Sequence, residues 1–363
     1  MKPILFGIIG LGIGSCGMLR AANPVLDWNE VTRQAIGRAT LPPGLAARQL
    51  AILHLAVWRV AKETDGDPAA ISSAAHEVCR TLFAGDAAFF ASVAAQHRSG
   101  NGTKAEDARV LAKAIIDSRA ADGSTTMIHY VPKDEPGQWR RTTRNRPPEL
   151  PHWPKVTPFC METPSAFRLP QPPALDSKEY AEAWTEVRDL GATNSPTRTQ
   201  EQSDIAVFWS DFTYTSSPPG HWNEIAQVVA EEKNLSVIAS ARLFCILNLA
   251  LADAGIAAFD SKYHHNFWRP VTSIPQADRD GNEATESDLD WKPFLLTPSH
   301  PEYPSAHSVF SGAAAEVLAK FFGADDIPFK IGSDSMPDVK RSYTSFSSCA
   351  QEISRSRIYG GIH

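Results

Sequence analysis

The feature that most constrains the fold of this chain is a long apolar run from about Ser236 to Trp268, with ARLFCILNLALADAGIAAFDSKY at its centre. Its apolar residues would surround a helix on nearly every side, as in a helix buried among other elements. Asn248 and Asp253 interrupt the run, which argues against a membrane span, where polar groups are costly. The run therefore predicts a central, buried helix.

The N-terminal part of the chain is also expected to be helical. From Asp27 to about Glu63, the stretch ARQLAILHLAVWRVAKE places leucine, valine and tryptophan at helical spacing. Two alanine-rich helices are expected near Ala69–His97 and Lys104–Ala121, joined by the turn RSGNGT. No strand-like alternation competes with these helices. The predicted fold class is all-α, built as a helical bundle around one buried core.

A proline-rich stretch interrupts the helices. Between Pro132 and Pro173 lie 11 of the 27 prolines, together with Trp139, Trp153 and the basic run WRRTTRNR. Proline at this density excludes long helices and central strands, so the stretch is either an extended segment wrapping the helical body or a linker. The tryptophans favour wrapping. We divide the chain into helical region 23–130, wrapping segment 131–176 and a second helical region, 177–363.

Residues 1–22 are expected to be a targeting segment. Lys2 is followed by an apolar stretch that is short for a membrane span and then by small residues, the layout of a secretory signal peptide. The sequence IGSC also resembles a bacterial lipoprotein box, in which Cys16 would carry lipid. An uncleaved N-terminal anchor is the alternative. The protein is therefore expected to be exported, to the periplasm or outside the cell.

Export bears on the remaining cysteines, which show no CxxC spacing: Cys79, Cys160, Cys245 and Cys349. One or two disulfides are compatible with an oxidising compartment, whereas Cys245, in the apolar run, is expected to be a buried free thiol.

The net charge of −6 provides no overall basic field for nucleic acid. An anionic ligand would therefore need locally concentrated positive charge.

The first such concentration is KYHHNFWRP. Lys262 and Arg269 are seven residues apart, which at about 100° per residue leaves them about 20° apart around a helix. Two cations would then share one helical face, and Pro270 would end or kink the helix. The alternative is a solvated surface stripe.

The second is HPEYPSAHSVFSGAAAEVLAKFFG. Pro304 and Ser305 are expected to open a helix whose first turn carries His307. Unpaired N–H groups and the helix dipole make such a start favourable for an anion, with the histidine beside it as a proton donor. An ordinary helix start with an incidental histidine is the alternative.

The third is SRSRIYGGIH, in which Arg357 and His363 are six residues apart across two glycines. Arginine offers a bidentate fork for an oxyanion, and a neutral imidazole can act as a nucleophile or an oxyanion ligand.

In this order, the three motifs resemble the superfamily of vanadium-dependent haloperoxidases, type 2 phosphatidic acid phosphatases and bacterial acid phosphatases. The stretches RTQEQSDIAVFW, PPGHWNEIA, FDSKYHHNFWRPVTSI and HPEYPSAHSVFSGAAAEV look like a group of secreted bacterial haloperoxidase-like members. The resemblance implies a helical fold whose bundles converge on one oxyanion pocket, with 177–363 as the catalytic region.

The resemblance also implies residue roles. The cations that would hold the equatorial oxygens of vanadate or phosphate are Lys262, Arg269 and Arg357. The Ser305 hydroxyl and the Ala306 amide would add hydrogen bonds, and His307 would be the acid–base residue. His363 would be the axial ligand of vanadate, or the nucleophile that forms a phosphohistidine in a phosphatase.

The leading hypothesis is a haloperoxidase that uses vanadate to oxidise a halide with hydrogen peroxide. His300 stands where algal bromoperoxidases have histidine and fungal chloroperoxidases have phenylalanine, which favours bromide or iodide; a loop histidine bonded to backbone is the alternative. The other hypotheses are an acid phosphatase acting on phosphate esters and an inactive oxyanion-binding relative. No zinc motif and no transmembrane bundle is evident, and the oligomeric state is left open.

Two departures from the family pattern raise expectations of their own. Ala306 stands where the family usually has glycine; its methyl group could narrow the pocket, or be costly if the position required a positive φ. The sequence stops at His363, where family members continue through a further helix, often with an acidic residue that orients the histidine. This predicts a truncated product whose imidazole lacks support. His221, His264 and His265 could line the pocket, but satisfied core positions are the simpler interpretation.

Overall fold

The computed structural model describes residues 23–97, 102–142, 146–212 and 214–363. The predicted targeting segment, including Cys16, lies outside the described residues. The fold class is confirmed, because nearly all regular structure is helical. The helices are α1 (Pro24–Arg38), α2 (Pro43–Thr64), α3 (Pro68–Leu82), α4 (Ala87–Gln96), α5 (Gly102–Ser118), α6 (Lys178–Gly191), α7 (Gln200–Phe208), α8 (Ser217–Glu232), α9 (Val237–His265), α10 (Pro270–Ser273), α11 (Ala306–Phe322) and α12 (Phe346–Tyr359).

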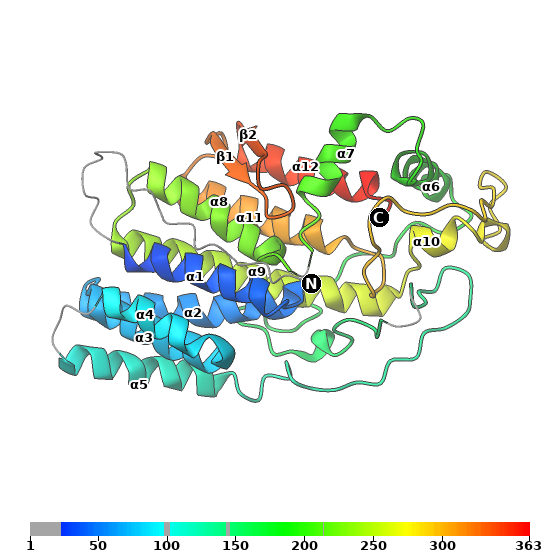
Figure 1. Ribbon diagram of the computed structural model, residues 1–363. Helices are drawn as coiled ribbons and strands as arrows, with labels where there is room; N and C mark the ends of the chain where they lie inside the picture. Colours follow the sequence, from blue (N-terminus) through cyan, green and yellow to red (C-terminus); the bar gives the residue numbers. More distant parts are fainter. Residues whose placement is uncertain (1–22, 98–101, 143–145, 213) are drawn as a thin grey trace, which may run out of the picture.

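The central helix is α9, as the apolar run predicts. It packs against α2, α8 and α11, so that α1–α5 lie on one side of it and α8, α11 and α12 on the other (Figure 1). Its polar interruptions are satisfied inside the fold: Asn248 and Asn223 exchange hydrogen bonds of 2.8 Å between their side-chain amides. Among the described residues, α9 is long and apolar enough to cross a membrane, but 56% of its apolar window is buried in the protein.

The proline-rich segment wraps the helical body, as its tryptophans indicate. Trp139 and Trp153 are both buried, and Trp153 belongs to a short 3-10 turn (Trp153–Lys155) in an otherwise irregular course (Figure 1). The buried carboxylate of Asp253 on α9 accepts backbone N–H bonds of 2.7–2.8 Å from residues 159–161. The segment is therefore fastened to the central helix rather than free as a linker.

The N-terminal helices are shorter than predicted. The pattern from Asp27 to Glu63 is divided into α1 and α2 at Thr40, whose positive φ of 49° turns the chain before Pro42 and Pro43. The pattern over Ala69–His97 is divided into α3 and α4 by a 3-10 turn at Ala84–Asp86. Periodicity continued across both breaks because the flanking helices bury residues in the same core.

Two smaller features also differ from expectation. An antiparallel hairpin, β1 (Phe329–Gly332) with β2 (Lys340–Tyr343), lies between α11 and α12. The cysteines of the described chain are all free thiols, so the suggested disulfides are absent; Cys245 is buried and unpaired, as predicted, and Cys160 is exposed.

Candidate oxyanion site

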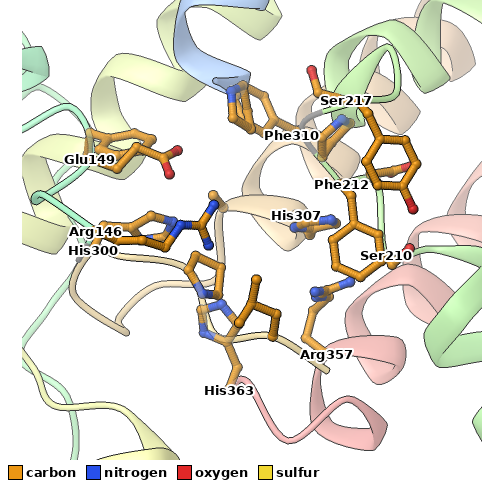
Figure 2. A pocket seen from close by; sticks show the side chains of 18 residues that line it. Arg146, Glu149, Ser210, Phe212, Ser217, His300, His307, Phe310, Arg357 and His363 are labelled. Carbon is orange, nitrogen blue, oxygen red and sulfur yellow. The ribbon is translucent and has the colours of Figure 1, made fainter. Parts of the chain in front are cut away.

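A cavity of about 260 Å³ lies where the second and third motifs converge (Figure 2). Five of the predicted site residues line it: His300, Ala306, His307, Arg357 and His363. Residues from the wrapping segment and from the region between α7 and α8 also line it: Arg146, Glu149, Ser210, Asp211, Phe212 and Tyr214. Segments far apart in the sequence therefore build one pocket.

The first motif is not arranged as predicted. Helix α9 ends at His265 because Asn266 adopts a left-handed conformation with a φ of 50°. Arg269 therefore lies outside α9, at the start of the short helix α10, and does not share a helical face with Lys262. The two side chains nevertheless reach the same loop, residues 300–302, from different directions.

Lys262 and Arg269 are completely buried and bonded to backbone. The Lys262 ammonium donates to the carbonyls of Pro301 (2.9 Å) and Glu302 (2.8 Å). Arg269 donates to the carbonyls of His300 (3.0 Å) and Ile362 (2.9 Å). Both cations lie directly behind the cavity wall, where they join α9 and α10 to the loop before α11 and to the chain end.

Burial lowers the pKa of both groups. The pKa of Lys262 lies well below its usual value because of burial and then the neighbouring Arg269 charge. The pKa of Arg269 is lowered to about 10, mainly by burial, against the opposing effect of Glu302. A bound anion would counter both effects, because it favours the charged forms.

Arg357, in the last turn of α12, has unused hydrogen-bonding capacity. Its Nη1 donates to the Trp209 carbonyl at 2.7 Å, whereas its buried Nε has no partner among the described residues. Burial lowers its pKa to about 10, and Asp211 opposes that shift. A buried donor without an acceptor is costly, so this guanidinium is well suited to an anionic ligand.

His307 lies in the first turn of α11 and faces the cavity (Figure 2). Its Nε2 is buried without a partner among the described residues. Burial, followed by the charges of Arg357 and Lys262, holds its pKa well below the usual value. The imidazole is therefore neutral, and a bound anion would raise its pKa and allow it to take up a proton.

His363 is fixed at both ring nitrogens. Its Nδ1 lies 2.6 Å from Oε1 of Glu302, and its Nε2 lies 3.0 Å from Nη1 of Arg269. Arg269 can only donate, so Nε2 carries a lone pair and the proton resides on Nδ1, donated to the carboxylate. The expectation that this imidazole lacks support is wrong, because Glu302 orients it. Its pKa is held well below the usual value by burial and then by Arg269.

Ser305 caps α11 by accepting a hydrogen bond from the Ser308 N–H at 3.4 Å, as predicted for a helix start, but it does not line the cavity. Ala306, the first residue of α11, does line it. The concern about a positive φ at Ala306 is wrong, since this position is not among the left-handed residues of the described chain.

The remaining histidines take different roles. His300 lines the cavity, and its Nδ1 accepts from Arg269 at 3.0 Å, so it is more than a backbone-bonded loop residue. His221 is a satisfied core residue, bonded to Asp211 (3.0 Å) and the Gly332 carbonyl (2.9 Å). His264 is exposed and His265 is half-buried, and neither lines the cavity.

Sequence reasoning missed Glu302, Arg146 and Glu149. Glu302 lies between two recognised motifs, in HPEYPSAH, where a carboxylate two residues from His300 was a usable signal. Arg146 and Glu149 lie in the wrapping segment, and no spacing rule connects that segment to α11 or α12. Their place in the pocket depends on tertiary structure alone.

The residues present fit an oxyanion such as vanadate. The buried Nε of Arg357 and Nε2 of His307 lack partners among the described residues. His363 lines the same cavity, and its Nε2 lone pair, which accepts from Arg269 Nη1, would have to leave that bond to reach an anion. Buried cations surround this space, so the electrostatic environment favours negative charge.

Comparison with known proteins gives relatives along most of the chain. Residues 242–363 match the family described as VCPO second helical-bundle domain. The vanadium chloroperoxidase of Curvularia inaequalis is 28% identical to this chain. The match covers 52% of this chain and only 37% of that relative's length. The crystal structure of a bacterial vanadium-dependent iodoperoxidase is 28% identical, with a TM-score of 0.77, covering 94% of this chain and 90% of that one. A holo-type bacterial vanadium-dependent chloroperoxidase, 16% identical with a TM-score of 0.71, shares the fold over 96% of this chain and 89% of its own.

Proposed function

Because this chain belongs to the vanadium haloperoxidase family, we propose that it is a vanadate-dependent enzyme that oxidises bromide or iodide with hydrogen peroxide. One observation carries the proposal. The imidazole of His363, oriented through Glu302, lines the same cavity as His307 and Arg357, which each keep a buried nitrogen without a partner among the described residues. The likeness to a bacterial iodoperoxidase along nearly the whole chain supports this choice.

Vanadate would be held by His363 Nε2 and by the cations around the cavity: Lys262, Arg269 and Arg357. When bound, it supplies a Lewis-acid centre that activates peroxide toward halide. Lys262 and Arg269 would contribute their charge from behind the wall, while Arg357 donates through its free Nε. The Ala306 amide, at the N-terminus of α11, would add a backbone donor.

His307 would move the proton. Its imidazole is neutral, so Nε2 would be able to accept a proton from hydrogen peroxide and return it to the oxygen that leaves. His300 is the residue proposed to favour bromide or iodide, since its imidazole lines the cavity.

The test is halogenation of a phenolic dye after loading with vanadate, using peroxide with iodide, bromide or chloride. We expect activity with iodide and bromide, loss of activity in His363→Ala, and retention in His264→Ala, which alters an exposed histidine outside the cavity. The same preparations are assayed with a chromogenic phosphate ester. Hydrolysis of the ester without halogenation would favour a phosphatase, whereas silence in both assays would favour an inactive relative.

Export is a separate proposal that rests on residues 1–22. The full chain, expressed in a bacterium, is expected in the exported fraction and shortened at its N-terminus. Radiolabelled palmitate incorporation that disappears in Cys16→Ser would identify a lipoprotein, and an unprocessed cytoplasmic chain would contradict export.

A further inference from the structure

Glu149 is an acidic side chain inside a pocket otherwise suited to anions. It belongs to the wrapping segment, but it lines the same cavity as His307, Arg357 and His363. Figure 2 shows its carboxyl group pointing into the pocket, with the Arg146 side chain beside it. A carboxylate at this place would repel an oxyanion, so its protonation state matters to the site.

The position of Glu149 is set by the segments that carry the site. Its N–H donates to the Ser299 carbonyl at 2.7 Å, directly before His300. Its carbonyl accepts from the Tyr263 hydroxyl at 2.5 Å, directly after Lys262. Both contacts use the backbone of Glu149, so a change of side chain leaves them intact.

The carboxyl group itself is free to bind a ligand. No hydrogen bond from the described residues reaches its oxygens, although the group is largely enclosed. Burial raises its pKa, and this effect outweighs the opposing charges of Arg146, Arg269 and Lys262. The titratable or charged groups that face it across the cavity or through its wall are Arg146, Asp211, Tyr214, Lys262, Tyr263, Arg269, His300, His307, Arg357 and His363.

We propose that Glu149 is a second proton-carrying residue of the oxyanion pocket, whose carboxyl group takes up a proton when an oxyanion binds and donates a hydrogen bond to it. The proton passes from solvent to the carboxylate, so the anion meets a neutral donor instead of a negative charge. This inference rests on the proposed oxyanion site and adds a residue from outside the three motifs.

Isothermal titration calorimetry with inorganic phosphate, in buffers of different ionisation enthalpy, measures the protons taken up on binding. Above neutral pH, we expect Glu149→Gln to take up about one proton fewer than wild type when phosphate binds. For each unit of rising pH, its phosphate affinity should therefore fall by a factor about tenfold smaller than the fall in wild type. Glu162→Gln is the matched control, because it changes an exposed carboxylate of the same segment and should behave like wild type.

A second measurement needs no variant. Phosphate-induced difference infrared spectra of the wild-type protein should show a carboxylate band replaced by a carboxylic acid band. Equal proton uptake by wild type and Glu149→Gln, or spectra without a new carboxylic acid band, would overturn the role of Glu149 and leave the oxyanion site standing. Failure of wild type to bind either phosphate or vanadate would overturn the site and, with it, this inference.

Discussion

Arg269 and Arg357 appear equivalent in the sequence but differ in the structure. Both are buried, and burial lowers both pKa values to about 10. Arg269 is fully engaged, donating to backbone carbonyls of two segments and to two histidines. Among the described residues, Arg357 donates to one acceptor, the Trp209 carbonyl, and its Nε has no partner. We infer that Arg269 assembles the pocket, whereas Arg357 is left available to the ligand.

The largest expected effect is on stability. Arg269→Met should lower the free energy of unfolding by about 3–5 kcal/mol, because it leaves several buried acceptors unpaired. Arg357→Met should lower it by about 1–2 kcal/mol, since a single hydrogen bond is lost. Urea unfolding of both variants tests the difference, with Arg242→Met, on the exposed surface of α9, as control. Equal losses for the two buried arginines would show that the comparison is wrong.

The second effect concerns binding and should affect Arg357→Met strongly. Loss of a charge-assisted donor to the anion should weaken phosphate binding about 10–100-fold while the variant stays folded. Calorimetric titration at constant pH measures it, and thermal unfolding in parallel confirms that the fold persists. Wild-type affinity in this variant would mean that the free Nε does not face the ligand.

The difference between these arginines marks the limit of what the sequence predicts. The apolar run of α9, the helix start at Ser305 and the pairing of Arg357 with His363 depend on local periodicity and spacing, and all three lie where predicted. The prediction that Lys262 and Arg269 share one helical face is wrong, because the left-handed residue Asn266 ends the helix between them. Glu302 and Glu149 were missed since their roles arise from contacts between distant segments.

Glu302, like Arg269, holds part of the pocket in place, because its carboxylate orients the His363 ring. In Glu302→Gln the negative acceptor for the Nδ1 proton is lost, so the ring would be held less firmly in the tautomer that presents the Nε2 lone pair. We expect a decrease of about tenfold in vanadate or phosphate affinity with little change in stability. Proton and nitrogen NMR of the His363 ring reports the tautomer directly; an unchanged tautomer and affinity would assign Glu302 a purely structural role.

His307 and His363 should both make the free energy of unfolding depend on pH in the same direction. The folded pKa values of His307 and His363 lie below the unfolded value of 6.5, so their contribution to stability is present above pH 6.5 and is lost as the pH falls toward the folded pKa. Each neutral histidine adds a slope of about 1.4 kcal/mol per pH unit. His307→Gln should remove one such slope in urea unfolding between pH 6.5 and 5.

Saturating phosphate should change the pH dependence of wild-type stability in the same direction as His307→Gln. A bound anion raises the pKa of His307, so saturating phosphate should flatten the acid side of the stability profile. It should have less effect on the profile of His307→Gln. An identical flattening in both proteins would assign the coupling to another group, such as His300 or His363.

The smallest expected effect is that of substituting Ala306, which lines the cavity. The backbone there is not left-handed, so glycine gains no conformational advantage. Ala306→Gly should cost about 0.5–1 kcal/mol, through the greater backbone entropy that glycine loses in a helix. Because the amide remains in place, phosphate affinity should change by less than about threefold. A large gain in affinity would instead show that the Ala306 methyl group narrows the pocket and that this side chain, rather than either arginine, limits access of the anion.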